Sequence, residues 1–184
     1  PLGSVKLTTQ KFYRINGGAT QLKGVTPDIV LPDRYRYVDV GEKEMDNAMP
    51  WSEIEGLDYK SWPKSYNIDK AKKKSHKRVK KSSVFDLIDD NAKRIQDNRE
   101  NTKKTLNLEE FIEEQEKLQQ ASEELREARK QVAPIDVHYL KEDKTTFKQD
   151  TLKQERFDKW KKNLKKDVHL EEALHIMEDI KMKG

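Results

Sequence analysis

Cysteine is absent from this chain of 184 residues. Its absence excludes disulfide bonds and metal centres held by thiolates, and it fits either a reducing cytosol or a secreted protein without disulfides. Long apolar runs are also missing, because no stretch approaches the roughly 18 residues that cross a bilayer. The sequence contains no signal peptide, and it therefore offers no targeting signal from which to infer a compartment.

Apolar residues are scarce as a class. They make up 33% of the chain, whereas charged residues make up 39%. The 38 basic and 34 acidic side chains nearly cancel, so self-repulsion does not force the chain to expand. We therefore expect an ordered protein with a thin core, built from helices that each bury one narrow apolar stripe.

Signatures of catalysis are missing as well. There is no glycine-rich phosphate loop, no GxSxG nucleophile elbow and no HExxH pair. The four histidines are His76, His138, His169 and His175, and none of them stand four residues apart. We expect no metal site and no cofactor, and nothing in these residues alone makes the chain a self-sufficient enzyme.

The first thirty residues differ in amino-acid composition from the rest of the chain. Residues 5–16 alternate between two faces and are dense in Thr, Tyr and Val, which predicts a strand. Gly17 and Gly18 supply a turn, because glycine tolerates positive φ. Residues 29–31 form a second short apolar strand that Pro32 ends. We predict that residues 5–15 pair with residues 28–31, with residues 135–139, or with another chain.

The remainder predicts helices. Ser83 begins one of them as an N-cap, and Asn107 begins a long one over 107–132, with Glu110 completing a capping box before Pro134 ends it. Two more helices begin near Asp150 and Asp167. In the long helix Phe111, Leu118, Leu125 and Val132 recur every seven residues. Gln115 and Ser122 interrupt that seam, so a packed arm is favoured over a free-standing coiled coil. The predicted fold class is mainly α with a small β element.

Residues 70–81 hold eight basic side chains in twelve positions. Such a block can bind phosphate backbones or an anionic membrane, or it can be a solvated helix face. No aromatic residues are interleaved for base stacking, so nucleic acid is disfavoured. As candidate contacts with a substrate or partner we take two sets of residues. The first is basic and comprises Lys72, Lys73, Lys74, Lys77 and Arg78; the second is apolar and comprises Phe111, Leu118 and Leu125.

The opening residues also resemble a known family. They are similar to the stretch that follows the catalytic lysine in tail-specific (carboxy-terminal processing) proteases. The matching motifs are TTQKFYR at 8–14, NGG at 16–18, TQ at 20–21 and KGVTPDI at 23–29, followed by GEK at 41–43 and DNAMPW at 46–51. The second group resembles the junction into the helical carboxy-terminal domain of the long, periplasmic type. From residue 51 onward the likeness is mainly one of charged helical character.

The resemblance implies a parent serine endopeptidase with a PDZ domain, located in the periplasm or cell envelope, in which a lysine is the general base for the serine. Both residues precede the matched block in that family, so we expect this chain to contain neither and to be inactive alone. Residues 1–40 would be the terminal β segment of the peptidase domain, and residues 41–184 the helical domain. The implied partners are the PDZ and catalytic core, unfolded protein substrates and an adaptor protein.

Pro-Leu-Gly-Ser at residues 1–4 is typical of the remnant of tag cleavage, which suggests a segment of a longer protein. The leading hypothesis is a non-catalytic region that supports the protease fold and engages substrates or an adaptor. The alternative is a stand-alone helical interaction module that binds an anionic partner. The sequence upstream in the gene would discriminate between them.

Overall fold

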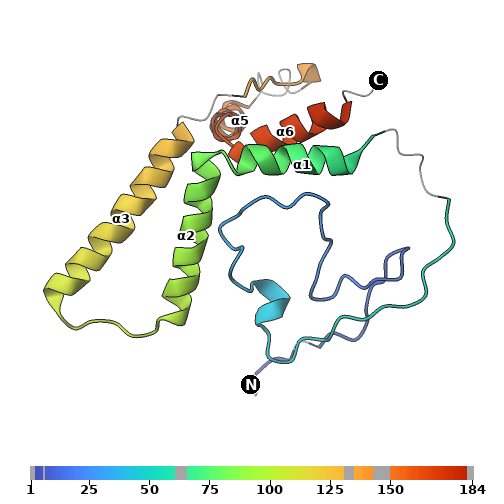
Figure 1. Ribbon diagram of the computed structural model, residues 1–184, viewed down its shortest axis with the longest axis horizontal. Coiled ribbons are helices and arrows are strands. Elements are labelled where there is room, and N and C mark those ends of the chain that lie inside the picture. Colours follow the sequence, from blue (N-terminus) through green and yellow to red (C-terminus); the bar gives the residue numbers. More distant parts are fainter. Residues whose placement is uncertain (1–2, 6, 61–65, 131–134, 143–149, 182–184) are drawn as a thin grey trace.

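The structure is a computed structural model that describes residues 3–5, 7–60, 66–130, 135–142 and 150–181. The described part is mainly helical, as predicted (Figure 1). A short 3₁₀ helix, η1, is followed by the α-helices. Their bounds are η1 Gly41–Glu44, α1 Ile68–Val79, α2 Ser83–Glu100, α3 Leu108–Lys130, α5 Thr151–Leu164 and α6 Val168–Lys181.

Side-chain caps begin most of these helices where the sequence predicts. The Asn107 carboxamide oxygen accepts from the backbone N–H of Glu109 and Glu110, and the carboxylates of Asp150 and Asp167 cap α5 and α6 in the same way. Glu110 does not close the predicted capping box, because its carboxylate accepts from Thr105 instead. Helix α2 begins at Ser83 itself, so Ser83 is not the N-cap; that position is Ser82, whose side chain makes no capping bond.

The core lies where the ends of several helices meet. Its buried residues are Phe85 and Ile88 on α2 and Val168 at the start of α6. Four half-buried residues pack around them: Leu31, Val79 on α1, Val84 on α2 itself, and Leu125 on α3. Burying a side chain of this size contributes about 1.5–3 kcal/mol, so a few residues hold five segments together. The thin core matches the low apolar content.

Helix α3 packs beside α2 as the second limb of a helical hairpin (Figure 1). The packing is shallow, because none of its described residues is buried. Leu125 reaches the core near the base of the hairpin, whereas Phe111 near its tip is 44% exposed. The predicted packed arm is thus present only in the C-terminal half of α3, where Leu118 and Leu125 are half-buried, and the helix is exposed from residue 117 back to its tip. Residues 131–134, which include the predicted Val132 and Pro134, lie outside the described part.

The predicted N-terminal strands are wrong. Within the described residues no strand forms. Apart from η1, the described residues before 61 follow an irregular path with two isolated β-bridges, Tyr13 with Ala19 and Gly18 with Glu53. Residues 28–31 and 135–139 form no bridge with residues 7–15. A strand needs a hydrogen-bonding neighbour along its length, and this segment finds only a tight turn and the passing chain at 52–57.

Gly17 holds that turn together. Its φ is +87°, and a Cβ at this position would lie 2.0 Å from the carbonyl oxygen of Ile54. The close approach allows the N–H of Ile54 to donate to the carbonyl oxygen of Gly17 at 2.9 Å. The predicted glycine turn is therefore confirmed, although the strands it should connect are not formed.

Candidate functional site

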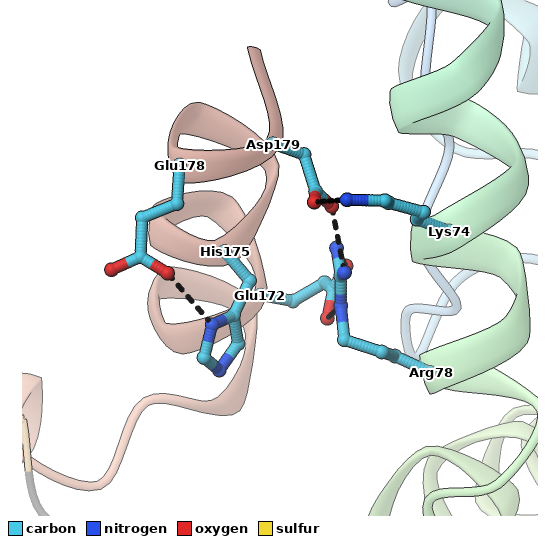
Figure 2. A network of polar contacts seen from close by, with 6 residues as sticks. All are labelled: Lys74, Arg78, Glu172, His175, Glu178 and Asp179. Carbon is cyan, nitrogen blue, oxygen red and sulfur yellow. Dashed lines mark hydrogen bonds and ion pairs between the residues drawn. The ribbon is translucent and has the colours of Figure 1, made fainter. Parts of the chain in front are cut away.

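The candidate site is built on α1 and α6, which lie side by side although they are far apart in the sequence (Figure 1). Charged residues line their contact (Figure 2). The guanidinium of Arg78 donates to both carboxylate oxygens of Glu172, at 2.7 and 2.9 Å, and also to Asp179 at 2.7 Å. Only 4% of Glu172 is exposed, whereas a third of the Arg78 side chain faces solvent, so this ion pair is partly buried.

Lys74 completes the network. Its ammonium lies 2.5 Å from Asp179, one helical turn from Arg78 along the same face of α1 (Figure 2). Hydrogen bonds from Lys74 and then Arg78 hold the pKa of Asp179 below its ordinary value. The bond to Glu172, followed by the bond to Asp179, raises the pKa of Arg78. Both groups are therefore charged throughout the neutral range, and the network clamps α1 to α6.

The outward side of α1 has the opposite character. Its lysines, which we call the lysine row, are exposed and form no ion pair with the described residues. The row comprises Lys70, Lys73, Lys77 and Lys80, with Lys72 to one side of it. Elsewhere on the surface, basic residues such as Lys93 and Lys130 pair with acids three or four positions away. The charge of α1 is thus neutralised on one side only.

The structure separates the predicted basic contacts into two groups. Lys72, Lys73 and Lys77 are exposed and available, whereas Lys74 and Arg78 are engaged with α6. The predicted apolar contacts lie on a different helix, α3. Leu125 packs against the core, Leu118 is half-buried, and Phe111 is exposed.

Glu172 and Asp179 were not predicted as important residues. Two of the apolar side chains of α6, Leu174 and Met177, are exposed. The face that meets α1 instead carries the two acids, seven positions apart. The sequence does contain a signal for this contact, namely two acidic residues seven positions apart on one helix and two basic residues on another. Hydrophobic periodicity cannot detect it, because it considers apolar residues only.

The described residues contain no group of three or more His, Asp or Glu side chains placed to hold a metal ion. None of their helices combines the length and apolar character that a membrane span requires.

The fold defines the class of this protein as a charged helical domain with a thin core. The described residues contain no assembled reaction centre. Residues 35–182 match a family model described as the C-terminal domain of tail specific protease (DUF3340). The chain therefore belongs to the family of C-terminal domains of tail-specific proteases, and the sequence resemblance is confirmed.

A curated relative agrees with this assignment. The chain is 49% identical over 59 residues to the tail-specific protease of Haemophilus influenzae. That match covers 32% of this chain and only 8% of the relative, so the chain corresponds to a small part of the relative's length. No solved structure shows significant similarity to the chain.

Proposed function

We propose that the chain is the non-catalytic C-terminal region of a periplasmic serine endopeptidase that degrades or trims proteins from their C-termini. In this proposal residues 1–40 complete the peptidase domain and residues 41–184 form a helical domain that engages unfolded substrates or an adaptor. The PDZ and catalytic core of the parent protease would be its permanent partner.

One observation carries the structural part of this proposal. Residues 5–30 have the composition of strands, yet in the described part they form none and leave large apolar side chains in water. Val5 is 86% exposed, Leu7 79% and Phe12 69%. Exposed apolar side chains in a β-forming segment indicate a missing neighbour, because a sheet edge and a hydrophobic face both need a partner. A peptidase sheet would supply both.

The helical part supports a role in binding. The tip of the α2–α3 hairpin exposes Leu108, Phe111 and Ile112, and a groove of about 400 Å³ between the two helices includes Phe111 and Leu118. Apolar side chains beside a groove suit an unfolded polypeptide, which offers apolar residues of its own.

The test requires the parent protease, which contains this chain and the residues upstream of it. We expect the parent to hydrolyse an unstructured protein in a reaction that depends on its serine. The double variant Phe111→Ser, Ile112→Ser should cleave long substrates several-fold more slowly and should cleave a short peptide at the same rate as the parent. The paired substitution Glu113→Gln with Glu116→Gln on the same helix is the matched control. Deleting residues 107–132 from the parent protease tests the same role by removing the whole predicted helix. Unchanged cleavage of long substrates and unchanged partner binding in all variants would remove α3 from the proposal.

A further inference from the structure

A small groove lies between residues 29–31 and α1. Its volume is about 80 Å³, and α1 contributes Lys72, Ser75, His76 and Val79 to its lining. This is room for a carboxylate group or a few water molecules, and it is too small for a nucleobase or a sugar.

Ser75 is the unusual member of this lining. Only 1% of Ser75 is exposed, and its hydroxyl forms no hydrogen bond with any described residue. A buried hydroxyl without a partner costs about 1–3 kcal/mol, and such groups are rare in folded proteins. A serine in the middle of a helix is also a weaker helix former than alanine. Because Ser75 lines the groove, its missing partner is a group that enters the groove from outside the chain, either a water molecule or an oxygen of a ligand.

The charge of the lining selects the kind of ligand. Lys72 and His76 stand at the exposed side of α1, and no acidic residue lines the groove. A hydroxyl donor and an ammonium donor together suit an anionic oxygen. Val79 and residues 29–31 provide apolar walls, which fit the methylene groups of an acidic side chain.

The lysine row extends this site along α1. Lys73, Lys77 and Lys80 follow Lys72 around the exposed side, and each is a flexible point charge rather than a planar fork. Arg78, which could read a carboxylate in a fixed bidentate geometry, is already bound to Glu172. Lysines alone suit several carboxylates on an extended, adaptable chain better than one rigid ligand.

We propose that the groove binds a carboxylate of an acidic, extended polypeptide segment, with Ser75 and Lys72 on that carboxylate and the lysine row on neighbouring acidic residues. The inference rests on the proposed function, because it names the class of polypeptide that the domain engages. An anionic membrane is the less suitable partner, because the apolar side of α1, with Ala71 and Val79, is turned into the protein and cannot insert.

The experiment measures binding of two synthetic peptides to the whole chain by fluorescence anisotropy at low and physiological salt. One peptide alternates Glu with Ala, and the other has Gln at every Glu position. We expect only the Glu peptide to bind, with an affinity that falls as salt rises. The triple variant Lys72→Gln, Lys73→Gln, Lys77→Gln should weaken binding about tenfold, and Ser75→Ala about threefold.

The matched control carries the same charge change on α5, as Lys153→Gln, Lys159→Gln and Lys162→Gln, and should bind as the parent chain does. Ser75→Ala should fold normally, since alanine favours a helix, and circular dichroism checks this. Equal binding of the two peptides, or equal losses in the α1 and α5 variants, would overturn the proposal. So would lysine-dependent binding to anionic vesicles without binding to the Glu peptide. If the peptide result fails while the hairpin variants still slow cleavage of long substrates, the proposed function stands and this inference does not.

Discussion

Arg78 carries more of the α1–α6 contact than any other residue, because its guanidinium reaches both Glu172 and Asp179. We expect Arg78→Met to lower the free energy of unfolding by about 2 kcal/mol. That value is below the 3–5 kcal/mol typical of a broken buried pair, because a third of the Arg78 side chain faces solvent. The loss arises chiefly from leaving Glu172 buried and unpaired. Urea unfolding followed by circular dichroism measures it.

Two variants make that measurement specific. Lys77→Met removes a neighbouring charge that forms no ion pair with the described residues, and it should change stability by less than about 0.5 kcal/mol. Adding Glu172→Leu to Arg78→Met should recover most of the loss, because the buried charge is then gone. A loss of equal size for Lys77→Met would show that overall charge, and not the ion pair, sets the effect.

Asp179 makes the contact sensitive to acid. Its pKa is lowered in the folded chain by Lys74 and Arg78, so its stabilising contribution is fully present above the unfolded pKa, near 3.8. The contribution is lost as pH falls from that value through the lower folded pKa. We therefore expect the free energy of unfolding to drop more steeply below about pH 4 in the parent chain than in Asp179→Asn.

The control for this pH profile is Asp46→Asn. Asp46 is exposed and its carboxylate forms no ion pair with the described residues. Its substitution should leave the acid limb of the profile unchanged. Parallel profiles for the parent chain and Asp179→Asn would contradict the assigned role of the Lys74–Asp179 pair.

At the scale of the element, α3 is held at one end and free at the other. Leu125 touches the core at the base of the hairpin, so Leu125→Ala should cost about 1–2 kcal/mol, less than a fully buried leucine. Phe111→Ala removes a larger side chain at the exposed tip but should cost less than Leu125→Ala. Urea midpoints of the two variants provide the comparison, and a larger loss for Phe111→Ala would show that the tip also packs.

Helix positions were predictable because their signals are local. Asn107, Asp150 and Asp167 each cap the helix that they precede. The lysine row was likewise visible as a basic block. A cap or a stripe acts over a few residues, so it can be recognised without knowing what packs nearby.

Pairings were not predictable, since they join residues far apart. The sequence shows that Arg78 is basic and Glu172 acidic, but not that the two meet across 94 positions. The N-terminal strands failed for a related reason. Residues 5–16 have strand propensity, yet propensity describes how well a segment fits a sheet and does not provide the neighbouring strand.

At the scale of the molecule, exposed apolar side chains concentrate before residue 60, and the helices after it carry most of the charge. We expect the isolated chain to associate at high concentration through this N-terminal part. Replacing Leu7, Phe12 and Val25 by serine should reduce the association, because none of the three is buried in the fold.

Size-exclusion chromatography with light scattering measures the mass of each form. The matched control replaces Leu152, Leu174 and Met177, which are exposed apolar residues on α5 and α6, by serine. It should associate as the parent chain does. If all three chains were monomers at every concentration, the predicted self-association through the N-terminal part would be contradicted. The domain division proposed for residues 1–40 would be weakened as well.

The clamp between α1 and α6 also sets the order in which the domain can fold. Arg78 emerges with its positive charge and must wait for Glu172, which lies 94 residues later in the chain. Whether the chain emerges from a ribosome or from an export channel, α1 and α6 can close on each other only after nearly the whole domain has appeared.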